Sequence, residues 1–178
     1  MRRLPGDPSE EDDVKSMIRV DHAGEYGAMR IYAGQLAVMR DSAKRKLVEH
    51  MARQEKQHLQ TFEQLMRTRK VRPTVLMPLW HVAGFALGAA TALMGEKAAF
   101  ACTVAVEEVI DKHYAAQRER LGGNESVLAQ TIEKFRAEEV QHRDMGLEQG
   151  AEEAPLYPAL SVAIKGASRL AIWLSTRI

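Results

Sequence analysis

This 178-residue sequence contains only one cysteine and has almost no excess of positive or negative charge. Its single cysteine, Cys102, excludes an intramolecular disulfide and a thiolate metal cluster, so a metal site would need histidine and carboxylate ligands. A lone cysteine is also typical of a reducing compartment. Lys and Arg number 25 against 24 Asp and Glu, and this balance argues against nucleic-acid binding.

Glycine and proline are also sparse, and no alternating β-branched run lies between turn residues. Long stretches of Ala, Leu, Met, Glu, Gln, Arg and Lys instead favour an all-α fold. The length suits one domain over residues 1–178. We expect Ser9 and Asp12 to cap the first helix, residues 122–124 to form a loop and residues 1–8 to be flexible. The expected helices span about residues 9–39, 43–67, 75–94, 96–121, 125–149 and 159–176.

Two Glu-x-x-His motifs stand out, at residues 55–58 and 139–142. Chance would supply about 0.6 such motifs in this composition, so their spacing to a further glutamate decides their meaning. Glu25 lies 30 residues before the first motif, and Glu107 lies 32 residues before the second. The chain is therefore interpreted as two similar halves, each with a glutamate on one helix and Glu-x-x-His on the next.

Residues three apart on a helix share a face, so each motif can hold one metal ion while its carboxylate reaches a second. This combination is typical of ferritin-like dimetal carboxylate bundles. Four carboxylates also balance the charge of two divalent cations. Oxygen-rich ligation with one imidazole per metal favours iron over zinc, so we expect two iron ions per chain. The predicted ligands are Glu25, Glu55, His58, Glu107, Glu139 and His142.

For two of these predicted ligands, an adjacent glutamate is an alternative ligand in the sequence. Glu107 lies on an apolar helical stripe, whereas Glu108 aligns with charged positions. Glu139 has a histidine three residues later, whereas Glu138 is expected at the surface with Lys134, four residues before it, as its partner.

Four segments around these residues carry a family resemblance. They are Ile18–Ala28 (IRVDHAGEYGA), Arg53–His58 (RQEKQH), Ala105–Tyr114 with its Glu107–Glu108 and His113–Tyr114 pairs, and Phe135–His142 (FRAEEVQH). From about residue 17 to the C-terminus, the sequence resembles demethoxyubiquinone hydroxylases, the di-iron monooxygenases of ubiquinone biosynthesis.

The resemblance implies the same six metal ligands and a reaction. That reaction is the O2-dependent hydroxylation of the ring of a polyprenylated demethoxyubiquinol, with electrons ultimately from NADH. The resemblance also implies that His113 and Tyr114 lie beside the metal site as a candidate electron relay. A lipid-binding accessory protein that presents the substrate is a further implied partner.

Ligating histidines need a partner for their second ring nitrogen. Asp21 is expected to orient one of them and Asp111, a weaker candidate, the other. His22 is interpreted as a capping or supporting residue rather than a ligand, while His50 and His81 are expected to be structural or at the surface. Cys102 is expected in the core.

Residues 75–94 carry no formal charge and would extend about 30 Å as a helix, enough to cross a bilayer. A crossing there would place Glu25 and Glu107 on opposite sides, which one shared site excludes. We expect this crossover helix and the amphipathic C-terminal helix to dock on an anionic membrane surface, the alternative being a plain buried crossover helix. The accompanying basic residues are Arg67, Arg69, Lys70, Arg72, Lys165, Arg169 and Arg177.

The N-terminal residues show no apolar signal segment, which favours the cytoplasmic face of a bacterial inner membrane, or the mitochondrial matrix side for a processed eukaryotic form. The expected partners are a lipophilic quinone, O2 and NADH, while the oligomeric state, including a homo-oligomer, stays open. Two other functions are consistent with parts of the sequence: a ferritin-like iron oxidase or storage protein, and a metal-free lipid-binding bundle. A rubrerythrin-type peroxidase is excluded because its cysteine centre needs more than one cysteine.

Overall fold

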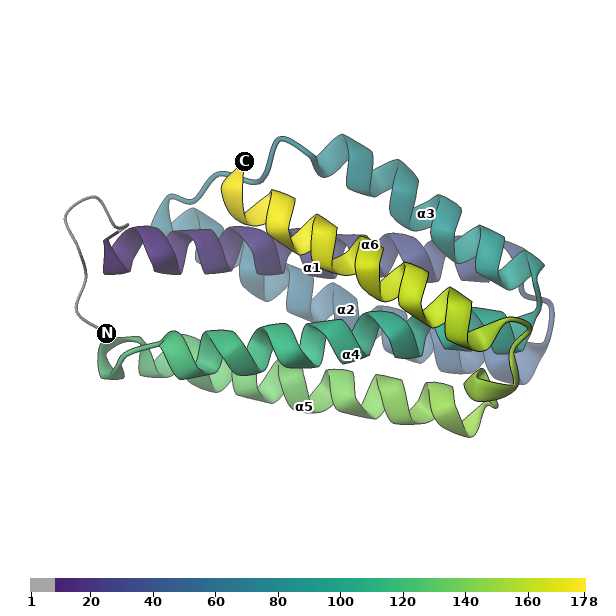
Figure 1. Cartoon of the computed structure of the whole chain (residues 1–178). Helices are drawn as coiled ribbons and strands as arrows, with labels where there is room; N and C mark the ends of the chain where they lie inside the picture. The colour runs from purple at the N-terminus through teal and green to yellow at the C-terminus, as the bar shows by residue number, and fades with distance from the viewer. Residues whose placement is uncertain (1–8) are drawn as a thin grey trace.

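Four long helices form a bundle, and two more lie against one side of it (Figure 1). The computed structural model describes residues 9–178, so the flexible segment expected at residues 1–8 lies outside the described residues. Within residues 9–178 there is no strand, which confirms the all-α, ferritin-like prediction. The bundle helices are α1 (Glu10–Val38), α2 (Ser42–Arg69), α4 (Glu96–Arg120) and α5 (Ser126–Glu148).

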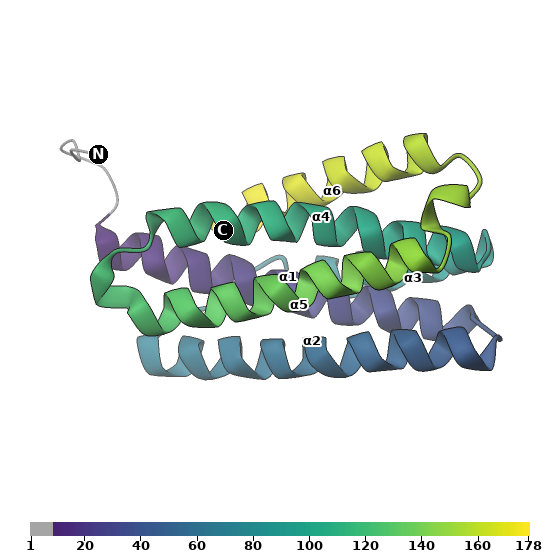
Figure 2. The same ribbon diagram turned by 90° about the horizontal axis from the view of Figure 1, so that it is seen from below.

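The two outer helices are α3 (Met77–Leu93) and α6 (Tyr157–Arg177). They pack on α1 and α4 and leave α2 and α5 on the opposite side of the molecule (Figure 2). Two short 3-10 helices, η1 (Gly123–Glu125) and η2 (Ala151–Glu153), connect α4 to α5 and α5 to α6. In the part of the chain that the structure describes, no helix is long and apolar enough to cross a membrane.

Local sequence signals explain where several helices begin. Ser9 Oγ accepts a hydrogen bond from the Asp12 amide at 3.1 Å and the Asp12 carboxylate accepts one from the Ser9 amide at 3.3 Å, which confirms the expected capping box. Asp41 caps α2 by accepting hydrogen bonds from two amides of the first turn. Gly95, at φ 120°, allows the sharp break between α3 and α4 that other residues would not adopt.

Helix boundaries depart from the prediction near prolines. α3 begins at Met77 rather than residue 75 because Pro78 occupies its first turn, where a missing N–H costs nothing. α6 begins at Tyr157 rather than residue 159 for the same reason, with Pro158 inside the first turn. α2 extends beyond residue 67 and ends at Arg69, followed by the C-cap residue Lys70, whose φ is 53°.

The apolar core is divided along the bundle into clusters on either side of its middle. One cluster gathers Tyr32, Met51 and Phe100 with their neighbours, and another gathers Phe62 and Ile132 with theirs. The predicted metal ligands lie in the middle of their helices, between these clusters. The two clusters therefore hold the four bundle helices firmly at each end of the ligand-bearing segment.

Helices α1 and α3 approach each other unusually closely. A Cβ atom on Gly88 would lie 1.9 Å from the backbone oxygen of Ile31, and one on Gly34 would lie 2.1 Å from that of Phe85. Only residues without a side chain fit at such contacts. The uncharged segment is therefore a crossover helix lying on the bundle.

Candidate metal centre

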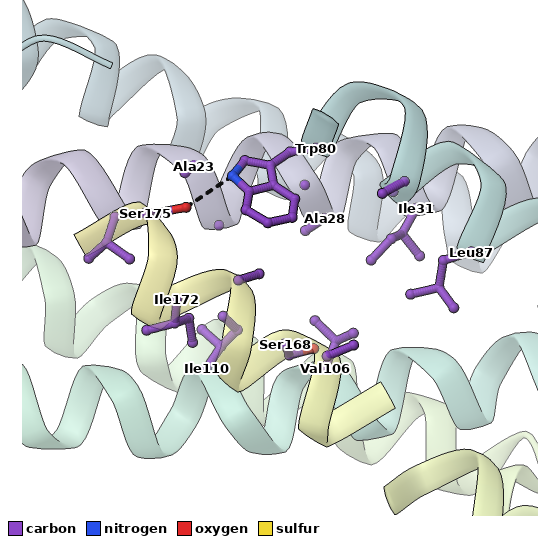
Figure 3. A pocket seen from close by; sticks show the side chains of 17 residues that line it. Ala23, Ala28, Ile31, Trp80, Leu87, Val106, Ile110, Ser168, Ile172 and Ser175 are labelled. Atoms are coloured by element: carbon purple, nitrogen blue, oxygen red, sulfur yellow. Dashed lines mark hydrogen bonds between the residues drawn. The ribbon is translucent and has the colours of Figure 1, made fainter. Parts of the chain in front are cut away.

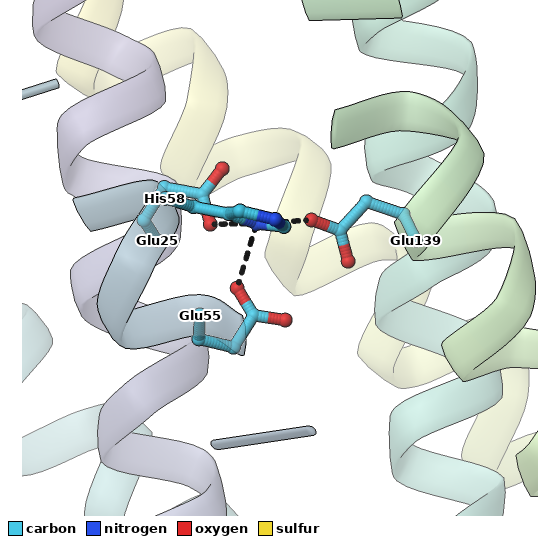
Figure 4. A group of neighbouring side chains, drawn as sticks. All are labelled: Glu25, Glu55, His58 and Glu139. Carbon is cyan, nitrogen blue, oxygen red and sulfur yellow. Dashed lines mark ion pairs between the residues drawn. The ribbon is translucent and has the colours of Figure 1, made fainter. Parts of the chain in front are cut away.

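All six predicted ligands meet in the middle of the bundle, and each is at most 3% exposed. Their side chains form two overlapping groups in which one possible ligand atom from every residue lies within 4.8 Å of the others. The first group contains Glu25 and His58, drawn in Figure 4, and the second contains Glu107 and His142. Glu55 and Glu139 belong to both groups, so either metal position would include both of these carboxylates among its candidate ligands.

The histidines direct Nδ1 toward these carboxylates. His58 Nδ1 lies 3.1 Å from Glu139 and 3.4 Å from Glu25, and His142 Nδ1 lies 3.1 Å from both Glu55 and Glu139. Glu55 Oε1, Glu55 Oε2 and His58 Nδ1 are buried and have no hydrogen-bond partner among the described residues. Because unsatisfied buried polar atoms are costly, this donor set fits metal ions that would satisfy them.

Electrostatics give the same indication. Burial, together with the nearby charge of Glu139, raises the pKa of both Glu55 and Glu107 well above the usual value. Burial would also raise the pKa of Glu139, but the close contacts of the His142 and His58 rings with its carboxylate outweigh burial and lower this pKa to about 2. Burial opposes protonation of His58, yet its close contacts with Glu139 and the other carboxylates raise its pKa. The cluster therefore takes up positive charge, as protons or as metal ions.

A tyrosine from each half supports a glutamate of the other half. The Tyr114 hydroxyl, on α4, donates a hydrogen bond to Glu25 on α1. The Tyr32 hydroxyl, on α1, donates one to Glu107 on α4 at 2.9 Å. Both tyrosines are 1% exposed, and burial is the main cause that raises their pKa well above the usual value. Each hydroxyl therefore stays protonated and fixes one carboxylate oxygen.

The outer ring nitrogens of the two histidines have partners that spacing along the sequence did not predict. His58 Nε2 lies 2.6 Å from Glu138 Oε2, and His142 Nε2 lies 3.1 Å from Gln54 Oε1. The description of Glu138 as a surface partner of Lys134 was therefore incomplete: the Lys134 ammonium lies 3.8 Å away and is exposed, whereas the contact to His58 is shorter and more buried.

The expected roles of Asp21 and Asp111 were wrong. Asp21 is buried but points to His113 Nε2, at 3.2 Å, and accepts a hydrogen bond from Gln117 at 2.7 Å. Asp111 forms an ion pair with Arg136 at 2.7 Å, away from both ligating histidines. The one-turn spacing placed these carboxylates near the ligands in sequence, but helix rotation directs Asp21 toward α4 and Asp111 toward α5.

Other residues agree with their interpretation. Glu108 faces outward and pairs with Lys165 of α6 at 2.5 Å, while Cys102 is fully buried. His81 is exposed, and its Nδ1 forms a hydrogen bond with the Tyr26 hydroxyl at 2.6 Å. The capping or supporting role expected of His22 stays a prediction: the residue is 8% exposed, and its Nδ1 has no hydrogen-bond partner among the described residues.

An apolar cavity of about 160 Å³ lies between α1, α3, α4 and α6 (Figure 3). None of the described residues that line it carries a charge, and Trp80, Leu87 and Ile172 contribute large side chains. A small second cavity is lined by the metal-site carboxylates together with His113 and Tyr114. The two cavities share five lining residues, so the apolar cavity adjoins the metal site. The shared residues are Val20, Gly24, Ala28, Ile110 and Ile172.

The two-half repeat contained the signal for the missed residues. Equivalent positions on the first helices are 82 residues apart, which relates Tyr114 to Tyr32. Positions on the second helices are 84 apart, which relates Glu138 to Gln54. Extending the repeat from the ligands to their neighbours would have identified Tyr32 and Gln54 from the sequence.

The chain is similar to a family of known proteins over most of its length. The family described as Ubiquinone biosynthesis protein COQ7 matches residues 12–175. The chain is 58% identical to 3-demethoxyubiquinol 3-hydroxylase of Rhodospirillum rubrum, over 99% of this chain and 84% of that protein. It is 53% identical to the human mitochondrial NADPH-dependent 3-demethoxyubiquinone 3-hydroxylase, over 93% and 78%, and 40% identical to the Saccharomyces cerevisiae mitochondrial 5-demethoxyubiquinone hydroxylase, over 91% and 77%. The chain therefore belongs to the COQ7 family of ubiquinone biosynthesis proteins.

Proposed function

We propose that this protein is an O2-dependent di-iron monooxygenase that hydroxylates the ring of a polyprenylated demethoxyubiquinol. The observation that carries the proposal is the pair of buried four-residue groups sharing Glu55 and Glu139, next to an apolar cavity. Two iron ions held there would supply the redox chemistry that activates O2. The names of the relatives, all demethoxyubiquinol or demethoxyubiquinone hydroxylases, support the substrate class.

The chain's own residues would bind and orient the substrate. The walls of the apolar cavity, including Ile31, Leu87 and Ile172, suit an isoprenoid tail because they offer no charge and few polar groups. A quinol ring that followed the shared wall residues would reach the smaller cavity, beside His113 and Tyr114. The buried hydroxyl of Tyr114 stays protonated and donates a hydrogen bond that orients the Glu25 carboxylate. Asp21 and Gln117 contact Nε2 of His113 and so fix the orientation of its ring. We retain this pair as the candidate electron relay.

We further propose that the substrate enters from a membrane on which α3 and α6 dock. Both helices carry exposed apolar side chains, among them Val82 at 65%, Val162 at 73% and Trp173 at 51%. Such a face, on the same side as the apolar cavity, is typical of a protein that lies on a bilayer. Two of the basic residues expected to contact lipid already form ion pairs within the protein, Arg69 with Glu125 and Lys165 with Glu108. Lipid phosphates would therefore bind the remaining basic residues.

For location, we propose the cytoplasmic face of a bacterial inner membrane, or the matrix side of the mitochondrial inner membrane for a eukaryotic form. The reductant is proposed to be a nicotinamide nucleotide. We expected NADH, whereas the human relative is named as NADPH-dependent, so both are compared in the assay. We also propose an accessory lipid-binding protein that presents the substrate, and self-association of the chain.

The test is a single-turnover assay on iron-loaded protein. After anaerobic reduction with NADH or NADPH in the presence of a short-chain demethoxyquinone, ¹⁸O2 is admitted. The product should be heavier by one oxygen atom and carry the label from O2. Absence of labelled product with either nucleotide, and with chemically reduced protein, would contradict the proposal.

The alternative of a ferritin-like iron oxidase or storage protein shares the ligand set. The apolar cavity beside the site does not favour it, because iron and O2 need no lipophilic entrance. An iron-loaded cage in solution, without quinone turnover, would favour this alternative. A metal-free lipid-binding bundle would instead be indicated by protein that stays free of iron after purification under iron-replete conditions.

A further inference from the structure

The contacts around the metal site repeat between the two halves of the chain almost residue for residue. Tyr32 and Tyr114 are equivalent, and each donates to the glutamate of the opposite half. The outer nitrogens of the histidines also contact equivalent positions, because each reaches the residue that precedes the other half's Glu-x-x-His motif. For His58 this residue is Glu138, and for His142 it is Gln54.

Among the contacts of the two ligating histidines, the charge of the outer partner differs between the halves. Both metal positions have one unshared glutamate, one histidine and the shared Glu55 and Glu139, so their inner ligand sets are the same. The partner of His58 is a carboxylate at 2.6 Å, whereas the partner of His142 is a neutral amide oxygen at 3.1 Å. The two metal positions therefore differ in the residues that contact the ligating histidines, not in the candidate ligands themselves.

We propose that Glu138 and Gln54 make the two metal positions inequivalent, with the position of Glu25 and His58 binding a divalent cation more tightly than the position of Glu107 and His142. The inference rests on the proposed dimetal centre. Glu138 and Gln54 are positioning residues that act through the histidines, not metal ligands themselves.

The physical reason is the hydrogen bond from each outer N–H. A carboxylate that accepts this bond makes the imidazole a stronger electron donor through its other nitrogen than a neutral amide does. It also adds a negative charge close to the cation. Changes to such outer partners typically alter metal affinity about 10- to 100-fold. A charged partner on one side alone is therefore expected to separate the two affinities by at least about tenfold.

Ring contacts add to the asymmetry. His58 stacks on Phe135, with ring centroids 3.9 Å apart, and so its ring plane is fixed from a second side. The position equivalent to Phe135 in the other half is Met51, a non-aromatic residue whose Sδ lies 3.8 Å from the Tyr32 hydroxyl oxygen. The His58 imidazole is therefore held by both a charged hydrogen-bond acceptor and a stacked ring.

The experiment titrates the metal-free full-length chain with Mn(II) and follows free Mn(II) by electron paramagnetic resonance. The wild-type protein should bind two ions in steps separated by about tenfold or more in dissociation constant. Glu138→Gln should weaken the tighter step until the two steps merge, and Gln54→Glu should strengthen the weaker step. Combining both substitutions should restore two separated steps.

The matched control is Glu133→Gln, which removes a carboxylate from the same helix at an exposed position paired with Arg136. It should leave both steps in place, and circular dichroism of every variant checks that the helices form. Two equal steps in the wild type, or an equal loss at both positions in Glu138→Gln, would overturn the inequivalence while leaving the dimetal centre standing. A wild-type chain that binds no Mn(II) or Fe(II) would instead overturn the dimetal centre itself.

Discussion

Trp80 on α3 donates a hydrogen bond from its indole Nε1 to Oγ of Ser175 on α6, across 3.0 Å. Both residues line the apolar cavity, and the bond is drawn in Figure 3. Ser175 is 2% exposed, so water competes little for its hydroxyl. The bond joins the two outer helices at a place where both border the cavity, and it therefore ties the width of the cavity to the separation of α3 and α6.

Ser175→Ala should loosen this connection. Loss of the acceptor leaves the half-buried indole N–H unpaired, at a cost of about 1 kcal/mol, and admits water to the cavity. In a Trp173→Phe background, the emission of Trp80 should shift to longer wavelength, and the KM for a demethoxyquinone should rise several-fold with unchanged metal content. Ser168→Ala, which alters another serine of the cavity wall, is the control. Unshifted Trp80 emission would contradict the role given to the bond.

Gly88→Ala should destabilise the protein by about 1–3 kcal/mol, as overpacking does. The added methyl group would meet the backbone oxygen of Ile31 at 1.9 Å, so α3 must move away from α1. Denaturant unfolding measures the change. Gly166→Ala is the control, because nothing lies within 4 Å of a Cβ atom there, and this helix position should gain up to about 1 kcal/mol instead. Equal stability of the two variants would rule out the close helix contact.

The sequence was sufficient to predict the six helices and the meeting of six Glu and His side chains in the bundle, and the reason is the repeat. Amphipathic periodicity identifies helices, and two copies of one spacing identify the residues that share an interior. The choice of Glu107 over Glu108 was correct because an apolar stripe fixes which side of a helix is buried. Boundaries near Pro78 and Pro158 were displaced by up to two residues, since proline is accepted inside a first turn as well as before it.

The supporting contacts could not be predicted by spacing along one helix. Asp21 lies one turn from Glu25, yet it contacts His113 of α4, and this depends on the rotation of two helices about their axes. Glu138 was assigned to the surface because of Lys134, a helical neighbour, while its shorter contact to His58 comes from a residue 80 positions away. Packing between helices, rather than local pattern, decides these roles.

Glu139→Ala should leave a folded helical chain that binds fewer than two iron ions. Glu139 belongs to both groups of ligands and lies 3.1 Å from both histidines, so its loss affects both metal positions. Iron analysis after anaerobic loading measures the stoichiometry, and circular dichroism reports the fold. Glu133→Ala, at an exposed position of the same helix, should keep two irons. Retention of both irons in Glu139→Ala would count against the assigned ligand set.

Trp173→Ala should weaken binding to vesicles that contain phosphatidylglycerol by about tenfold, because an exposed indole on α6 loses its contact with the bilayer. High salt should weaken binding further by screening the basic residues. Vesicle co-sedimentation provides the measurement, with Val127→Ala as the control, an exposed apolar residue on α5. A wild-type chain that does not sediment with vesicles at low salt would refute membrane docking.

Bound metal ions should stabilise the folded chain more strongly at higher pH. In the metal-free fold the pKa values of Glu55, Glu107 and His58 are raised. A group whose pKa is raised in the folded chain binds more protons there than in the unfolded chain, so its contribution to the free energy of unfolding falls as pH rises. This loss begins at about pH 4.5 for the glutamates and at about pH 6.5 for the histidine. Metal ions replace these protons and remove that loss.

The increase in melting temperature on adding Mn(II) should therefore be larger at pH 7.5 than at pH 5.5, since apparent affinity rises up to about tenfold per pH unit for each proton displaced. Taking the difference between metal-loaded and metal-free protein at each pH cancels groups outside the site, such as His22, whose pKa burial lowers and whose effect has the opposite sign. Differential scanning fluorimetry suffices for the measurement. A stabilisation that is constant over this range would mean that the cations do not compete with protons for Glu55, Glu107 and His58, and hence that they bind elsewhere.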